Sequence, residues 1–269
     1  MKTMNINKIL ISKFSVFLLL FSVYVKTTQA NDNVVHDKKS ITEIAKVYHA
    51  SMVYIFNIQS LINNKSINKE GLFGQSFIGN IQSTYKEMFN QPFPKKTDKH
   101  ISNLLTLMML VMEDNRTLLL DSYIEFKGFI PAIFAFQLSQ KFKERGFGLN
   151  IKFTNFEDRV RNKLNSPDYW EQSALAMLKE ENIEDVYDKE TYFEGKAALR
   201  YMRAVEITPM CLNCHGVPQD NPANADRDKK QWHHKDKTGF LMEGWKLGEL
   251  GGGISVVLYQ RKHNVYENK

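Results

Sequence analysis

Residues 197–216 read AALRYMRAVEITPMCLNCHG, and this stretch joins a structural pattern to a chemical one. As far as Ile207 it alternates short apolar and polar residues, which is typical of a β-strand. Directly afterwards, residues 211–215 have the order Cys-x-x-Cys-His and contain the only two cysteines of the chain. The stretch therefore predicts a strand that leads into a turn with a local chemical task.

Three further segments have the same alternating texture, namely 149–154, 184–193 and 250–259. We expect all three to be strands, with a helix between the first two that begins at Ser166 as cap and Pro167 as first residue. Residues 217–238 are rich in Pro, Asn, Asp and Lys, which indicates an exposed loop. This half of the chain predicts a small antiparallel sheet with the cysteine turn between its last two strands.

The preceding part of the chain is helical in pattern. Ser40-Ile41-Thr42-Glu43 has the form of a capping box, and apolar residues then recur at helical spacing. Further helical patterns cover about 77–88 and 98–120, and another begins at Pro131 and ends at Gly146. With helices first and a sheet afterwards, we expect the α+β fold class.

The first thirty residues have the layout of a secretory signal. Lysines precede an apolar run at 14–25, and the segment ends in Thr28-Gln29-Ala30. The run is shorter than the roughly 20 residues that span a bilayer, so we expect cleavage before Asn31 rather than an uncleaved anchor. The sequence predicts an exported, periplasmic protein without a membrane span in the mature chain.

Net charge says little about partners once this signal is considered. The whole chain carries +6, but residues 1–30 hold four lysines and no acidic residue, which leaves +2 for the mature part. A nearly neutral protein has no basic excess to attract a polyanion. We expect no nucleic-acid partner.

The Cys-x-x-Cys-His pattern has the spacing that covalent haem attachment needs. Two thiols about one turn apart can add to the two vinyl groups of haem, and the adjacent imidazole can reach the iron. Cys211, Cys214 and His215 supply these three groups. The sequence predicts one covalent haem c, with His215 as the iron ligand.

Three other interpretations of the cysteine pair compete with haem. A zinc site would need further ligands, for which His233 and His234 are the nearby candidates. A redox dithiol would normally open a helix early in a βαβ pattern, whereas this pair follows a late strand. A structural disulfide would close too short a loop to stabilise much of the fold. Export, the absence of other cysteines and the complete pentapeptide favour haem.

Three elements occur in a fixed order around this motif. They are Arg161-Asn162, Asn165, Pro167-Asp168 and Trp170-Glu171; then Cys211-Leu212 and Cys214-His215-Gly216; then Gly239-Phe240, Gly248-Glu249-Leu250, Gly252 and Ile254-Ser255. They resemble the RNxxNxPDxWE, CLxCHG and GDLxGxIS elements of the single-haem c-type cytochrome family with a PAS-like haem domain. That family includes exported bacterial proteins and the sensor portions of membrane kinases. The resemblance covers roughly residues 120–260.

The resemblance implies a PAS-like antiparallel sheet flanked by helices, with a long helical N-terminal part. Together with the sequence pattern, this divides the chain into a signal peptide at 1–30, a helical region at 31–120 that the motifs do not cover, and the haem domain at 121–269. Two departures matter. Some members of the family place a cysteine on the distal side of the haem, where this chain reads Phe126-Lys127-Gly128-Phe129, and Gly251 stands where an arginine is frequent.

Three arginines are further candidates for binding the cofactor. Arg161 either holds a haem propionate bidentately or is a structural arginine paired with Glu171 or Asp168. Arg200 and Arg203, on the strand before the cysteine turn, leave the same two interpretations open.

The sixth iron ligand is the least determined feature. A thioether from Met108, Met109, Met112, Met202 or Met242 and an imidazole from His49, His100, His233 or His234 are the alternatives. Most of these methionines fit core stripes, and most of the histidines lie in polar segments. We expect no strong distal protein ligand.

Two functions follow from a periplasmic mono-haem protein. We favour haem-based redox or small-ligand sensing, with a diffusible ligand and a separate signalling partner. The alternative is a soluble electron-transfer cytochrome with a redox partner protein. A peroxidase-type enzyme is less favoured because the sequence identifies no distal acid or base, although His49 or His100 could fold over the iron. Hydrolase and transferase motifs such as GxSxG, a phosphate loop and HExxH are absent.

Overall fold

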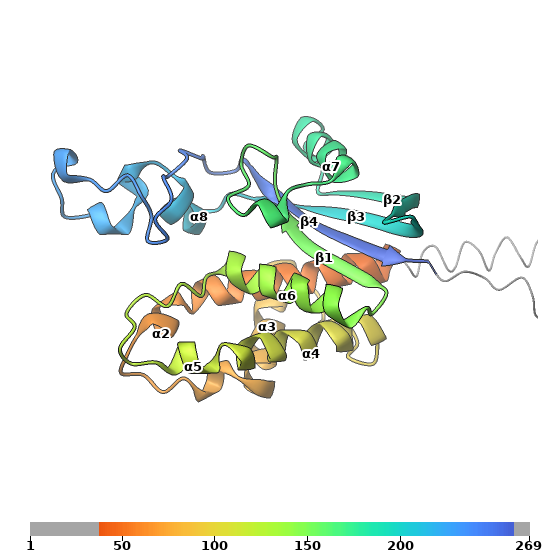
Figure 1. The fold of residues 1–269 in the computed structure, drawn as a ribbon, viewed down its shortest axis with the longest axis horizontal. Helices are drawn as coiled ribbons and strands as arrows, with labels where there is room; N and C mark the ends of the chain where they lie inside the picture. Colours follow the sequence, from red (N-terminus) through yellow and green to blue (C-terminus); the bar gives the residue numbers. More distant parts are fainter. Residues whose placement is uncertain (1–37, 261–269) are drawn as a thin grey trace, which may run out of the picture. The chain divides into compact units, whose positions relative to one another are not determined.

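The structure is a computed structural model that describes residues 38–260, and within it residues 41–260 belong to one compact unit (Figure 1). The predicted signal peptide at 1–30 lies outside the described residues. The chain has the predicted α+β class, with helices followed by an antiparallel sheet. Among the described residues, no helix has the length and apolar character needed to cross a membrane.

The helical part begins with a helix at residues 38–57, which has no label in Figure 1. The other helices are α2 (Gln59–Asn63), η1 (Glu70–Leu72), α3 (Gly74–Phe89), α4 (Lys99–Asp114), α5 (Arg116–Leu120) and α6 (Pro131–Arg145). The predicted cap at Ser40 is wrong, because the helix already includes residues 38–40. The ends of α6 follow the prediction. Pro131 is its first residue, and Gly146 closes it in the left-handed conformation at φ +61°.

The sheet has four antiparallel strands in the order β1-β4-β3-β2 (Figure 1). Their bounds are β1 (Leu149–Thr154), β2 (Asp185–Phe193), β3 (Lys196–Glu206) and β4 (Leu250–Tyr259), all close to the predicted segments. Because β3 and β4 are neighbours, the segment between them leaves and re-enters the sheet at one end. The backbone of Ile207 closes that end, donating to Glu249 O at 2.8 Å and accepting from Gly248 N at 2.9 Å.

Helices cover both faces of the sheet. On one face, Tyr201, Ile254 and Val256 are fully buried in a core that they share with α3, α4 and α6. On the other face, Met202 packs against Leu175 and the rest of α7 (Tyr169–Glu180). Strand alternation explains this division, since adjacent side chains point to opposite faces. The larger core binds the helical part to the sheet.

The segment between β3 and β4 lies beyond the end of the sheet (Figure 1). It begins with α8 (Pro209–His215) and continues through three single-turn helices, η3 (Pro218–Asp220), η4 (Pro222–Asn224) and η5 (Lys229–Gln231). The cysteine turn is thus a short helix. The following loop is largely exposed, as its polar composition predicts.

Candidate functional site

The two cysteines lie on α8, three residues apart and therefore on one helix face. Both are free thiols and partly exposed. Burial raises the pKa of the Cys214 thiol, and the charge of Asp236 adds to this effect. An activated redox dithiol needs a lowered thiol pKa, so the local electrostatics disfavour that interpretation. Two adjacent thiols remain, both accessible to a reactant.

His215 ends α8 and is held on two sides. Its Nδ1 lies 3.0 Å from Glu243 Oε2, and its ring stacks on Trp245 with 4.4 Å between centroids and 10° between planes. An ionised carboxylate can only accept a hydrogen bond, so Nδ1 is the donor and Nε2 is the nitrogen left for a metal. The imidazole is thereby set in the tautomer that binds a metal through Nε2.

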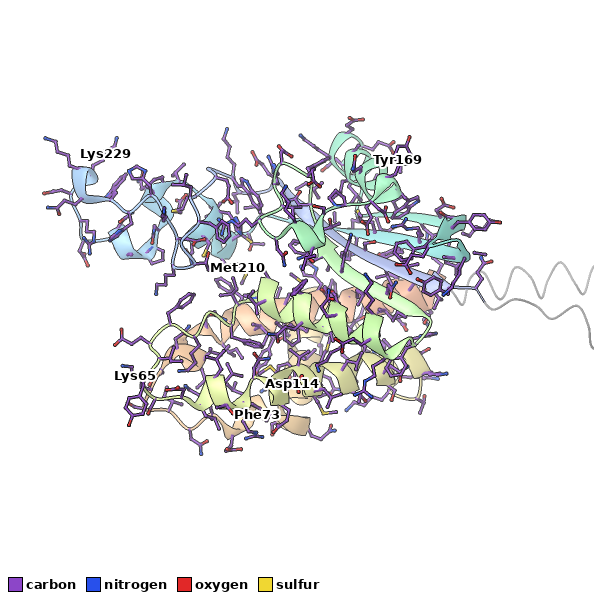
Figure 2. All side chains as sticks on the ribbon, in the orientation of Figure 1. Lys65, Phe73, Asp114, Tyr169, Met210 and Lys229 are labelled. Atoms are coloured by element: carbon purple, nitrogen blue, oxygen red, sulfur yellow. The ribbon has the colours of Figure 1, made fainter. Side chains whose placement is uncertain are left out.

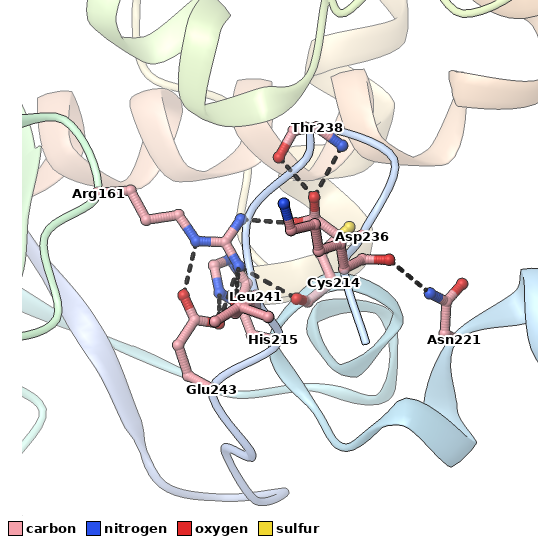
Figure 3. Close-up of polar contacts among 9 residues, drawn as sticks. Arg161, Cys214, His215, Asn221, Asp236, Thr238, Leu241 and Glu243 are labelled. Atoms are coloured by element: carbon pink, nitrogen blue, oxygen red, sulfur yellow. Dashed lines mark hydrogen bonds and ion pairs between the residues drawn. The ribbon is translucent and has the colours of Figure 1, made fainter. Parts of the chain in front are cut away.

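Arg161 organises the polar side of the site (Figure 3). Its Nε donates to Glu243 Oε1 at 2.6 Å and its Nη2 to Glu243 Oε2 at 2.8 Å, while Nη1 donates to Asp236 Oδ2 at 2.6 Å. Its Nη2 also lies 3.2 Å from the carbonyl oxygen of Cys214. One guanidinium therefore joins α8 to the returning loop at two carboxylates.

The charge of Glu243 depends on this arrangement. Burial alone would raise the pKa of its carboxyl group, but hydrogen bonds and charges from His215 and Arg161 lower the pKa to about 2. Asp236 behaves similarly. Burial opposes ionisation, and hydrogen bonds from Thr238 and Arg161 lower its pKa. Both carboxylates are ionised at neutral pH.

Backbone contacts fix the end of α8. Trp245 N donates to His215 O at 2.8 Å, and Gly244 N donates to Gly216 O at 3.0 Å. Only glycine fits at position 216 without a steric clash, because a Cβ there would stand 2.2 Å from Asp220 Oδ2 and 2.7 Å from Leu212 O. The segment 243–245 thus holds His215 by its side chain and by its backbone.

Apolar side chains are exposed on the segments that flank α8. They are Val217, Phe240, Leu241 and Leu247. Met210, labelled in Figure 2, is a partly exposed residue of α8 itself. Exposed apolar groups gathered around a reactive motif are typical of a binding surface.

The model of the Tll0287-like family matches residues 27–258, most of the chain. The chain belongs to the Tll0287-like family. Among solved structures, it is similar to the cyanobacterial heme-protein Tll0287, with a TM-score of 0.34 and 18% identity over 61% of this chain and 98% of that one. A similarity this low does not establish a common fold. No curated protein matches the chain.

The matched region of this Tll0287-like chain contains all three sequence elements identified above. Their more specific resemblance to covalent haem domains stays a prediction. So do the domain boundaries, although the described helices and sheet form one unit with a shared core.

The predicted structural pairing of Arg161 with Glu171 or Asp168 is not found in the structure. Asp168 and Glu171 pair with Arg200, at 2.6 and 3.5 Å, and not with Arg161. Arg161 does reach the site, but its donors contact Asp236, Glu243 and the carbonyl of Cys214. Its geometry is that of a residue that positions α8. A propionate would have to share or displace these partners.

Arg200 and Arg203 have partners on the two faces of the sheet, and their role in binding a cofactor stays a prediction. They stand three residues apart in β3 and so face opposite sides of the sheet. Arg200 lies over the ring of Trp170 on α7, at 4.5 Å, and Arg203 lies over Phe89 on α3, at 5.4 Å. Each guanidinium is engaged on its own face. The sequence did not indicate these partners, because alternation along the strand directs the two arginine side chains to opposite faces of the sheet.

The alternative metal ligands are also placed elsewhere. His233 and His234 are exposed, and within residues 38–260 no group of three or more His, Cys, Asp or Glu is arranged to hold a metal ion. Met108, Met112 and Met202 are fully buried in the two apolar cores, where they fill space as predicted.

Glu243, Trp245 and Asp236 are the site residues that the sequence did not reveal. They lie in a loop more than twenty residues after His215. An isolated acidic residue in a polar loop carries no periodicity and no spacing rule. Its pairing with His215 and Arg161 is a tertiary contact, which only the folded chain displays.

Proposed function

We propose that this Tll0287-like chain is a haem protein, with one haem bound covalently by Cys211 and Cys214 and His215 as the axial iron ligand. The observation that carries the proposal is the pair of free thiols on one face of α8, next to an imidazole whose Nδ1 is engaged. The described similarity to a heme-protein agrees with it but adds no argument of its own.

The residues present fit such a group. The thiols can each form one thioether bond, Nε2 of His215 is the remaining metal-binding atom, and the exposed side chains of Val217, Leu241 and Leu247 offer an apolar border. When bound, haem supplies an iron that changes oxidation state and accepts small ligands. Glu243, Trp245 and Arg161 orient the imidazole and the helix that carries it.

For the role of the haem, we propose redox or small-ligand sensing in the periplasm. Support comes from the distal side. Met108, Met112 and Met202 are committed to cores, and His49 lies against Phe89 with 6.3 Å between ring centroids. These residues are not available as strong ligands. Met109, Met242, His100, His233 and His234 are the remaining candidates, and they are partly or fully exposed. We still expect no strong distal ligand, so that the sixth position would take water or a small molecule.

Electron transfer is the second candidate. None of the residues of α8 is fully buried, so an attached group would have an edge near the surface, as a redox partner requires. Sensing and electron transfer both require a bound haem and no further catalytic group. A peroxidase would need a distal acid or base, and His49, one candidate, packs against Phe89 on α3 with 6.3 Å between ring centroids.

The test of attachment is expression with a c-type maturation system, followed by extraction into acidified organic solvent. Haem should remain with the denatured wild-type protein. Cys211→Ala and Cys214→Ala should each retain one thioether and change the absorption spectrum, and the double variant should lose covalent haem. His234→Ala is the control, because that residue is exposed and outside the motif. Haem that extracts freely from the wild type would refute the proposal.

Carbon monoxide separates the two roles. An open sixth position predicts that the ferrous protein binds the gas readily, as a sensor would. A low-spin ferrous protein that excludes carbon monoxide would favour electron transfer. In that case, a single Met→Ala or His→Ala change that restores binding would identify the distal ligand.

A further inference from the structure

Glu243 stands directly behind the proposed iron ligand, on the side away from Nε2. The carboxylate is 3.0 Å from His215 Nδ1, and the same Oε2 atom also accepts from Arg161. A carboxylate partner at this position increases the electron donation of an imidazole to a metal. In a haem-loaded protein, the contact would therefore affect the iron and not only the loop.

Arg161 does not pair with Glu243 alone. This guanidinium is shared between Glu243 and Asp236, so two carboxylates face one cation. The side chain of Asp236 is fully buried and that of Glu243 is 28% exposed, and water screens such groups less than it screens surface charges. The Arg159 guanidinium also lies near, 5.3 Å from the centroid of the Trp245 ring, but Glu243 is the carboxylate that directly contacts the imidazole.

A ferric iron carries one positive charge more than a ferrous iron. Nearby negative charge and a stronger imidazole donor both stabilise the ferric form. We propose that Glu243, held by Arg161, is a positioning residue that lowers the reduction potential of a His215-ligated haem. The inference rests on the proposed function.

Glu243→Gln tests the inference in the haem-loaded protein. Glutamine keeps the shape and an acceptor oxygen but removes the charge. The equilibrium constant for reduction should rise at least tenfold, which is an upward shift of about 59 mV for one electron. Glu249→Gln is the matched control. It removes one negative charge from the same loop, where Glu249 only approaches Arg159 at 3.7 Å, and it should change the constant less than threefold.

Asp236→Asn gives a second, independent variant, because Asp236 belongs to the same charge group but does not touch His215. It should raise the constant by more than Glu249→Gln and by less than Glu243→Gln. This order would hold for an electrostatic role and not for a purely structural one. If Glu243→Gln fails to mature, a larger rise for Asp236→Asn than for Glu249→Gln still tests the electrostatic role.

Failure of this inference and failure of the proposed function look different. Mass spectrometry first establishes whether the wild type carries covalent haem, and a protein without it overturns both proposals. A loaded wild type whose potential is unchanged by Asp236→Asn, and by Glu243→Gln where that variant matures, overturns only the role of Glu243. A downward shift in either variant would overturn it as well.

Discussion

At the scale of the residue, Gly216 shows how closely the end of α8 is packed. Gly216→Ala would press a methyl group against the backbone carbonyl of Leu212 and against Asp220, whose Oδ2 accepts from Val217 N at 2.9 Å. Such overpacking costs about 1–3 kcal/mol of folding free energy. We expect the variant to unfold at lower urea concentration and to mature with less haem.

The matched control for that substitution is Gly79→Ala. Gly79 lies inside α3, and a Cβ there meets nothing within 4 Å. Alanine should stabilise the helix by about 0.5–1 kcal/mol. Equal urea midpoints for the two alanine variants would mean that the space at Gly216 is not restricted in solution.

At the scale of the element, the sequence located most helices and strands because their patterns are local. The alternation in residues 197–207 predicts β3, and Pro131 with Gly146 marks the ends of α6. The segment around the cysteines was expected as a turn and is the short helix α8. Seven residues with proline first carry too little periodicity to distinguish the two.

The candidate site residues likewise divide into those that belong to a local motif and those that depend on tertiary contacts. Cys211, Cys214 and His215 stand in one local motif, so the sequence alone could name them. Arg200 and Arg203 could not be assigned, because their partners come from α7 and α3, on opposite faces of β3. Glu243 could not be found at all, since its role depends on the loop returning to α8.

At the scale of the whole molecule, His49 couples stability to pH. Burial first, and then the charge of Arg203, lower the pKa of this histidine from 6.5 to about 4 in the folded chain. Between pH 6.5 and about 4, the unfolded chain therefore binds a proton at His49 and the folded chain does not. The contribution of neutral His49 to the free energy of unfolding is therefore complete above pH 6.5 and is lost as the pH falls from there towards 4.

We expect a loss of about 1–3 kcal/mol from this group over that pH range. The measurement is the urea midpoint between pH 7 and pH 4, at a fixed haem content. His49→Gln should flatten this dependence, and His234→Gln, at an exposed position, should leave it as in the wild type. A dependence that His49→Gln leaves unchanged would show that His49 is not the titrating group.

The central claim for the molecule is covalent attachment at α8, and peptide mass spectrometry of the matured protein tests it most directly. After proteolysis under denaturing, acidic conditions, the peptide that contains Cys211 and Cys214 should carry the mass of one haem. The same peptide from the double cysteine variant should not. Wild-type peptide recovered with two unmodified thiols, or with a simple disulfide, from cells with active c-type maturation would contradict the account.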